Sequence, residues 1–309
     1  MHSRDRCVAC NHKSFYQVNY GQHLQTILPT IRGAKKIIKT ALLGIFDLGA
    51  PVPGVLRRRV LVWRAFHNTF RNKNIKICSN CGLGIIYPMP SQSDLDRYYK
   101  HIYWQSREQG LRLSVIDARG QAQADYISTF IEIKQLRRIL EFGAGQAGVS
   151  RALKQRNPSI SIGIVEESEL MRELHRKNGE VDDIALHLLS LTGRFDLIMA
   201  SHSLEHVGDV EATLSLFVEL LRPDGRLFVE VPNCYQRYFE LDIGDAPHTY
   251  FFTGTALAHL VARYGMKVED VSEWGPTWAE HGRGNLADGH LYFRSRGGWH
   301  LRGMFSKPR

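Results

Sequence analysis

A glycine-rich turn follows directly after an acidic residue in residues 139–148, which read ILEFGAGQAG. Gly143, Gly145 and Gly148 have the GxGxxG spacing of a nucleotide-binding turn, in which glycine lets the backbone approach a ligand closely. Glu141 precedes the first glycine by two residues. A dinucleotide would bring a pyrophosphate to this turn, and a carboxylate beside it would be repulsive. The combination therefore indicates a nucleoside that carries positive charge instead of phosphate.

A second acid, Glu166, lies 21 residues after Gly145, at the spacing expected for a hydrogen bond to an adenosine ribose. Both NAD and S-adenosylmethionine contain that ribose, so Glu166 does not separate them. Glu141 does, because S-adenosylmethionine has no phosphate and carries an ammonium and a sulfonium group. We expect S-adenosylmethionine, with Glu141 acting through water or the loop backbone. The alternatives are NAD, a packing turn without a ligand and, for Glu141, a solvated or helix-capping acid.

Strand and helix patterns alternate around these residues. Helical patterns cover residues 113–135, 148–157, 210–221 and 252–265, and strand patterns cover 137–142, 159–165, 195–200, 225–233, 266–274 and 290–296. One more strand is expected between residues 179 and 193. This alternation predicts an α/β fold with a mostly parallel, doubly wound sheet. The glycine turn and Glu166 then lie at the carboxyl ends of strands, where such sheets bind ligands.

Several of these segments together resemble class I S-adenosylmethionine-dependent methyltransferases. The matching segments are EFGAGQAG, EES at 166–168, FDLIMASHSLEHV at 195–207, LRPDGRLFVEVPN at 221–233 and HTYFFTGTALAHLVARYGMKV at 248–268. The combination is similar to ubiquinone-type O-methyltransferases and to methyltransferases of sugars and secondary metabolites, over about residues 137 to 296. The resemblance implies a Rossmann-like seven-stranded methyltransferase sheet with a final antiparallel strand.

Methyl transfer to a hydroxyl needs orientation, exclusion of water and a base, for which histidine is well suited. The resemblance implies that His206, in the segment SHSLEH, faces the cofactor and the acceptor. We predict His206 and Glu205 as catalytic residues; for each, the alternative is a structural role in holding the turn. His248 either lines the acceptor pocket or is structural. The predicted cofactor-binding residues are Glu141, Gly143, Ala144, Gly145, Glu166, Ser201 and His202, the last two at the methionine part.

Four of the five cysteines form two CxxC pairs, Cys7 with Cys10 and Cys78 with Cys81. Four thiolates at this spacing predict a closed, structural zinc site, and a glycine after the second pair permits the tight turn. The 67 residues between the pairs, a rival ligand in His12, and redox pairs or free core cysteines are the competing considerations. The fifth, Cys234, is expected to be a packed residue.

The segment after the second cysteine pair resembles zinc-bearing lead segments of some sugar and metabolite methyltransferases, which implies that it helps to cover the acceptor site. It reads CGLGIIYPMPSQSDLDRYYKHIYW. Its aromatic residues either line the acceptor pocket or pack between domains; they are Tyr98, Tyr99, Tyr103 and Trp104.

The net charge of +9 is concentrated in residues 31–76, which contain eleven basic residues and one acid. This basic insert places cations beside apolar stripes, which indicates a surface for an anionic membrane, for nucleic acid or a phosphorylated substrate, or a lid with a solvated basic face. No apolar run approaches the ~20 residues of a membrane span, and no secretory signal is visible. We expect a cytoplasmic protein, with membrane-surface contact through the insert as one option.

The predicted organisation is a small zinc-ribbon-like module at 1–110 containing the insert, a methyltransferase domain at 111–297 and a basic tail at 298–309. The expected activity is O-methylation of a small or carrier-linked metabolite such as a sugar, a lipid-linked compound or a secondary metabolite. The alternatives are an RNA methyltransferase that uses the basic module and a non-catalytic binding protein with the same fold. The sequence leaves the acceptor and the oligomeric state open.

Overall fold

The computed structural model describes residues 6–19, 69–70, 73–99, 118–235, 248–277 and 293–309. Most of the predicted basic insert at 31–76 lies outside these residues. Among the described helices, none combines the length and the apolar character that crossing a bilayer requires.

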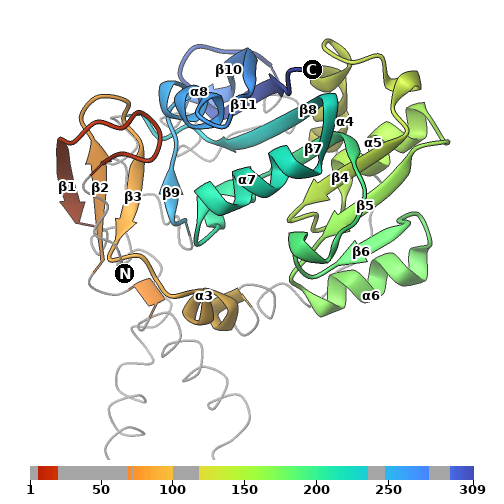
Figure 1. The fold of residues 1–309 in the computed structure, drawn as a ribbon, viewed down its shortest axis with the longest axis horizontal. Helices are drawn as coiled ribbons and strands as arrows, with labels where there is room; N and C mark the ends of the chain where they lie inside the picture. Colours follow the sequence, from red (N-terminus) through yellow and green to blue (C-terminus); the bar gives the residue numbers. More distant parts are fainter. Residues whose placement is uncertain (1–5, 20–68, 71–72, 100–117, 236–247, 278–292) are drawn as a thin grey trace, which may run out of the picture.

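The main element is a seven-stranded sheet with the strand order β10-β11-β8-β7-β4-β5-β6 (Figure 1). Only β11 runs against its neighbours, since the pairs from β8 to β6 are parallel and β11 pairs antiparallel with both β8 and β10. This confirms the predicted Rossmann-like α/β sheet with one antiparallel strand. The strands are β4 (Arg138–Phe142), β5 (Ser161–Val165), β6 (Asp183–Ala185), β7 (Phe195–Ser201), β8 (Leu221–Pro232), β10 (Lys267–Thr277) and β11 (Gly298–Ser306).

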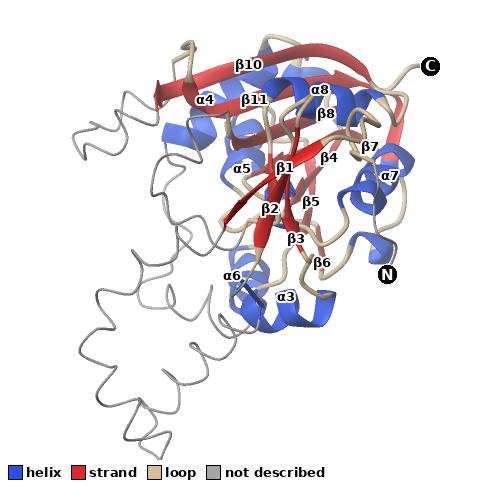
Figure 2. Cartoon of the chain, turned by 90° about the vertical axis from the view of Figure 1, so that its left-hand side faces the viewer, coloured by secondary structure: helices blue, strands red, loops and turns tan. Residues whose placement is uncertain are grey.

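Helices cover both faces of this sheet, so that α5 and α7 lie on opposite sides in Figure 2. The alternation along β4 explains the two layers, because Ile139 packs with α4 and α5 whereas Leu140 packs with α7 and α8. The helices are α4 (Ala118–Ser128), α5 (Gly148–Arg156), α6 (Glu169–Asn178), α7 (Val210–Leu220) and α8 (Gly254–Ala262). Of the helix predicted over 113–135, the structure describes α4 up to Ser128, and a separate 3-10 turn, η4 (Ile133–Gln135), lies at the end of the predicted range.

The prediction of a basic tail at 298–309 is wrong, because residues 298–306 form β11 inside the sheet. The prediction of a strand at 290–296 is also wrong for the residues that the structure describes. Residues 293–296 form only an isolated bridge, from Arg294 to Trp274. Leu301, Met304 and Phe305 are buried in the core. Two glycines and a central arginine obscured the strand pattern in GWHLRGMFS.

A second, four-stranded sheet joins the cysteine segment to the main body. Its order is β1-β2-β3-β9, with β1 (Phe15–Asn19), β2 (Asn74–Cys78), β3 (Gly84–Tyr87) and β9 (Tyr250–Phe251). The last of these strands comes from the segment between β8 and α8, so the boundary predicted at residue 110 is crossed by a shared sheet. Cys7, Cys78 and Leu83 also belong to the same buried cluster as Leu204 and Ala256 of the main body. The helix α3 (Gln92–Tyr98) follows β3 and lies beside the carboxyl ends of the main strands.

Candidate active site

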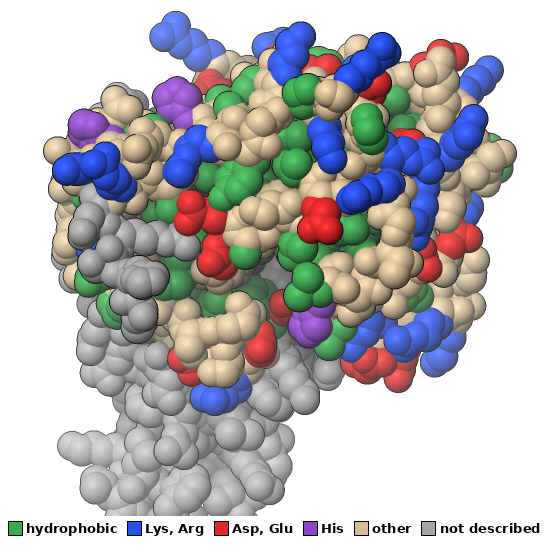
Figure 3. Space-filling view, in the orientation of Figure 1, with side chains coloured by type: hydrophobic (Ala, Val, Ile, Leu, Met, Phe, Trp, Pro, Cys, Tyr) green, Lys and Arg blue, Asp and Glu red, His purple; other side chains and the backbone are tan. Residues whose placement is uncertain are grey.

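A cavity of about 650 Å³ lies at the carboxyl ends of β4, β5 and β7, opposite α3. Figure 3 shows a hollow on this face, bordered by acidic side chains. The size suits a cofactor together with part of a small acceptor. The lining includes Gly143, Ala144, Gly145, Glu166, Glu167, Ser201, His202, His206 and, from the cysteine-bearing part, Gln92, Leu95 and Tyr99. Of the predicted cofactor-binding residues, all except Glu141 therefore meet here.

The glycine turn after β4 needs glycine at two positions. Gly143 has φ +65° and Gly145 has φ +50°, in the left-handed region that side chains disfavour. A Cβ at Gly143 would come within 2.5 Å of the Ser203 Cβ, so the turn can pack against the next loop only without a side chain. Ser203 Oγ donates to the Phe142 carbonyl at 2.8 Å, which ties the two loops together.

Glu166 at the end of β5 holds this turn by its backbone. Its Oε2 accepts from Gly145 N at 2.7 Å and its Oε1 from Ser168 N at 2.8 Å. Burial raises the pKa of Glu166, and these backbone donors act in the opposite direction. A carboxylate has about four acceptor positions, so positions remain for the hydroxyls of a ribose.

His175 on α6 holds Gly145 from the other side, a contact that the sequence analysis missed. Its Nε2 donates to the Gly145 carbonyl at 2.7 Å. Burial lowers the pKa of His175, so the ring is neutral near pH 7 with its proton on Nε2, because a carbonyl can only accept. Gly145 is thus fixed through both its N–H and its C=O. No local pattern distinguishes this histidine from the charged residues that follow it on the same helix.

Glu141 does not line the cavity. Its Oε2 accepts from Ser150 N at 2.9 Å, in the first turn of α5, and the side chain is buried. The helix-capping alternative therefore describes its geometry, and direct contact with the cofactor is not what the structure shows. Ala147, the N-cap residue of α5, has a left-handed backbone and supplies no side-chain cap, so Glu141 fills that role. Any effect on a bound cofactor passes through the loop backbone.

The charge on the cavity wall comes instead from Glu166, Glu167 and Asp209, and no Lys or Arg occurs among its described lining residues. Burial and the like charges of Asp96 and Glu166 raise the pKa of Glu167 to about 7. A polyphosphate would meet these carboxylates without a lysine or arginine among the described lining residues to compensate, whereas a sulfonium-bearing nucleoside is attracted. The preference for a cationic adenosyl donor, which the sequence analysis attributes to Glu141, thus has its physical basis in Glu166, Glu167 and Asp209.

His202, directly after β7, lies between two buried acids. Its backbone has φ +50°, its Nδ1 is 3.3 Å from Glu205 Oε1, and its Nε2 is 3.2 Å from Glu230 Oε1. Burial alone would lower the pKa of His202, but the two close carboxylates of Glu205 and Glu230 outweigh burial and raise it. His202 thus presents a positively polarised ring to the cavity, next to Ser201.

His206 lines the cavity, whereas Glu205 lies behind it and is buried. His206 Nε2 is 3.8 Å from Glu205 Oε1, and its ring centroid is 4.7 Å from that of His248. Although burial opposes ionisation, the neighbouring imidazoles of His206 and His202 hold the pKa of Glu205 at about 2. Burial, together with the charge of His206, lowers the pKa of His248 to about 3, so this ring stays neutral. An ionised acid and a neutral base therefore flank His206.

Tyr99 adds its ring to this wall, with its centroid 6.0 Å from that of His206. Tyr98 packs instead against Phe70, at 5.0 Å between ring centroids. Tyr103 and Trp104 lie outside the described residues. Of the predicted aromatic wall, Tyr99 is the member that the structure brings to the cavity.

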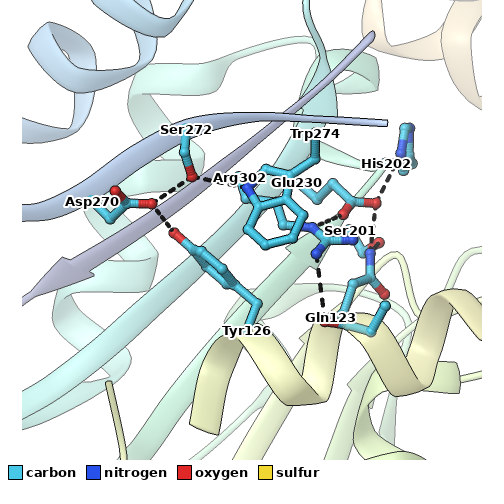
Figure 4. Close-up of polar contacts among 10 residues, drawn as sticks. Gln123, Tyr126, Ser201, His202, Glu230, Asp270, Ser272, Trp274 and Arg302 are labelled. Carbon is cyan, nitrogen blue, oxygen red and sulfur yellow. Dashed lines mark hydrogen bonds and ion pairs between the residues drawn. The ribbon is translucent and has the colours of Figure 1, made fainter. Parts of the chain in front are cut away.

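A buried polar network supports the end of β7 (Figure 4). Gln123 Nε2 donates to Ser201 Oγ and to Glu230 Oε1, each at 2.7 Å. Arg302 Nε donates to Glu230 Oε2 at 2.6 Å, and its guanidinium lies 4.4 Å from the centre of the Trp274 ring. Sequence reasoning missed Gln123, Glu230 and Arg302, because they come from three distant segments.

The four cysteines of the CxxC pairs come together on one side of the small sheet. Cys7 Sγ is 3.5 Å from Cys81 Sγ, Cys10 Sγ is 3.5 Å from Cys78 Sγ, and all four sulfurs lie within 4.8 Å of one another. Tetrahedral zinc with sulfur at about 2.3 Å needs sulfurs about 3.8 Å apart, so the quartet fits such an ion. A hydrogen bond from Cys81 lowers the pKa of Cys7, and the same contact raises the pKa of Cys81, so the first thiolate of the quartet forms at Cys7. His12 is exposed and is not part of the cluster.

Two histidine–carboxylate groups among the described residues also bring ligand-type atoms within 4.8 Å: His202, Glu230 and His300, and Glu205, His206 and His248. In the first, Arg302 already neutralises Glu230. His300 in that group is buried, and neither of its ring nitrogens has a hydrogen-bond partner within the part of the chain that the structure describes.

Comparison with known proteins agrees with this architecture. A family model described as a methyltransferase domain matches residues 95–271. The ubiquinone biosynthesis O-methyltransferase of Xylella fastidiosa strain M23 is 28% identical over 176 residues, which cover 51% of this chain and 71% of the relative. The protein of the same description from Xanthomonas euvesicatoria pv. vesicatoria strain 85-10 is 26% identical over 179 residues, covering 51% and 73%.

Solved structures with a similar fold include an S-adenosylmethionine-dependent methyltransferase from Mesorhizobium loti, with a TM-score of 0.45, 21% identity and coverage of 59% of this chain and 96% of that one. The matched domain spans more than half of the chain and contains the glycine turn, Glu166 and the turn with His206. The chain therefore belongs to the methyltransferase-domain family and is an S-adenosylmethionine-dependent methyltransferase.

Proposed function

We propose that the chain methylates a hydroxyl oxygen of a small or carrier-linked metabolite, and that His206 orients that hydroxyl and receives its proton. The observation that carries the proposal is the position of His206 on the cavity wall, between the ionised Glu205 and the neutral His248. The similarity to proteins described as ubiquinone biosynthesis O-methyltransferases supports transfer to oxygen.

The residues of this chain divide the work. Gly143, Gly145 and Glu166 are positioned to hold the adenosine part of S-adenosylmethionine, and Ser201 and His202 its methionine part. When bound, the cofactor supplies an electrophilic methyl group. A cavity filled by both molecules excludes water, and its walls orient the acceptor for an in-line displacement.

Proton transfer is the second requirement. A base within hydrogen-bond reach of the acceptor hydroxyl contributes about 10²–10⁴-fold to the rate. Glu205 does not line the cavity, so its role is to stabilise positive charge on His206 from behind. The acidic wall disfavours a polyanionic acceptor such as RNA, and we therefore place the neutral metabolite first.

The test is a screen of hydroxylated acceptors with S-adenosylmethionine, read out by product mass and by fragmentation that locates the methyl group. His206→Gln should reduce product formation at least 100-fold, the low end of general-base effects, while binding of S-adenosylmethionine persists. His187→Gln is the matched control, because His187 also lines the cavity but lies outside the cluster. A product methylated on nitrogen, or full activity of His206→Gln, would contradict the proposal.

We also propose that the cysteine quartet holds one structural zinc ion. The spacing of the four sulfurs, all within 4.8 Å of one another, and the burial of Cys7, Cys78 and Cys81 support a closed site without a catalytic position. Elemental analysis of protein purified without chelators should give one zinc per chain, and Cys7→Ser should lose it. Metal-free protein with four titratable thiols would refute this assignment. The predicted cytoplasmic location and the membrane contact through residues 31–76 stay predictions.

A further inference from the structure

A short buried segment, residues 248–253, connects the cysteine quartet to the turn that carries His206. We name it the strap. Its central residues form β9, which pairs with β3 through Tyr250 with Ile85 and Phe251 with Gly84. Tyr250, Phe251 and Phe252 are almost completely buried. The strap begins at His248, in contact with His206, and ends at Thr253, beside the second cysteine pair.

The end of the strap contacts the cysteine loop directly. Thr253 Oγ1 donates to the Cys81 carbonyl at 2.6 Å. A Cβ on Gly82 would come within 2.8 Å of Thr253 Cγ2, so the loop backbone lies against this threonine. Gly82 N in turn donates to the Cys78 carbonyl at 2.9 Å. The conformation of the cysteine loop and the position of the strap are therefore set together.

The start of the strap holds the turn with His206 through Thr249. Thr249 N donates to the Glu205 carbonyl at 2.8 Å, and its Oγ1 lies 2.9 Å from that carbonyl and 2.7 Å from the Val207 carbonyl. The two carbonyls flank His206 on either side. Ile86 N, on β3, donates to the Thr249 carbonyl at 3.0 Å. Thr249, which is completely buried, thus joins the cysteine-bearing sheet to the candidate catalytic turn.

We propose that Thr249 is a positioning residue through which the metal-loaded cysteine quartet fixes His206 and His248 at the acceptor side of the cavity. The inference rests on the proposed zinc site and on the proposed role of His206. Its physical basis is that a close-packed, hydrogen-bonded segment transmits displacements instead of absorbing them. Binding of the cofactor should not respond to changes at Thr249, because Gly145 is held by Glu166 and His175, which lie on other elements.

The experiment uses the full chain loaded with zinc and labelled with ¹³C at the histidine rings. Thr249→Val keeps the shape of the side chain and removes the hydroxyl, and Thr249→Ser restores the hydroxyl. The ring signals of His206 and His248 are assigned with His206→Gln and His248→Gln. Thr249→Val should shift both signals while zinc content and calorimetric affinity for S-adenosylmethionine stay at wild-type values, and Thr249→Ser should return both signals to their wild-type positions.

A second arm removes zinc with a chelator under conditions where the thermal melt shows folded protein. The same two signals should move in the wild type, and by less in Thr249→Val, since the hydroxyl contacts to the Glu205 and Val207 carbonyls are already lost there while the backbone contacts of residue 249 remain. If the chelated wild type unfolds, the comparison of Thr249→Val with Thr249→Ser tests the positioning role of Thr249 without the chelation experiment. Unmoved His206 and His248 signals in Thr249→Val, or a failure of Thr249→Ser to restore them, would overturn the inference. A chain without zinc would refute the metal proposal, and a chain that does not bind S-adenosylmethionine would refute the active-site assignment; both outcomes are read separately from the ring signals.

Discussion

Replacing His175 by phenylalanine tests whether the glycine turn must be held from both sides. The ring is completely buried, and its only hydrogen bond given by the structure is the 2.7 Å contact to the Gly145 carbonyl. Phenylalanine fills a similar volume and removes the donor. An acceptor left without a partner costs about 1–3 kcal/mol when it is fully buried. Gly145 is half-buried, so water can partly replace the lost donor and the low end of that range applies.

If ordering of the turn is required for binding, this loss is transferred to the cofactor. A loss of about 1–1.4 kcal/mol corresponds to a roughly five- to tenfold higher Kd for S-adenosylmethionine. Titration calorimetry at pH 7.5 measures it directly, and thermal melting verifies the fold. His259→Phe is the control, because His259 is exposed on α8 away from the cavity. Wild-type affinity in folded His175→Phe would show that Glu166 alone orders the turn.

Three further predictions concern other parts of the structure. Gly143→Ala should cost at least about 1–2 kcal/mol for its left-handed backbone, with a clash on Ser203 in addition. Urea unfolding measures the loss, and an unchanged free energy of unfolding would contradict the requirement for glycine at this position. Glu230→Gln leaves Arg302 buried without a counter-charge and should lower the free energy of unfolding by about 3–5 kcal/mol, so a loss below about 1 kcal/mol would contradict the ion-pair assignment. Burial lowers the pKa of His300 well below its value in the unfolded chain, so the unfolded chain binds the extra proton and the free energy of unfolding falls as the pH drops below about 6.5. His300→Phe should therefore lose less stability between pH 8 and pH 5 than the wild type. An unchanged dependence of the free energy of unfolding on pH would contradict this assignment.

The parts of the fold that the sequence could predict depend on local patterns. Apolar runs of strand length between helical periods give the parallel sheet, and the glycine turn with Glu166 gives the binding edge. The CxxC pairs predict their own cluster despite the long segment between them, because thiolate spacing within each pair already fits a common ion. The edge strand β6 has only three residues, which explains why its pattern was too weak to place.

The parts that could not be predicted depend on partners far apart in the chain. Arg302 makes residues 298–306 look like a polar tail, because the sequence does not show that Glu230, 72 residues earlier, neutralises it inside the sheet. The same holds for His175, whose partner is 30 residues away. Glu141 was interpreted by its distance from the glycines along the chain, whereas the backbone directs its carboxylate to Ser150. Side-chain direction, and not spacing, decided that role.

The central claim is that the acidic edge around the glycine turn binds a cationic adenosyl donor and not a polyphosphate one. The most direct measurement is titration calorimetry of the full chain with S-adenosylmethionine and with NAD, repeated on Glu166→Ala. Glu166 accepts two backbone hydrogen bonds and faces the cavity, and hydrogen bonds to a charged group are worth about 1.5–3 kcal/mol each, so its loss should weaken S-adenosylmethionine more than about tenfold. Saturable binding of S-adenosylmethionine without binding of NAD is the predicted result. Binding of NAD alone, or equal affinity of wild type and Glu166→Ala for S-adenosylmethionine, would contradict the account.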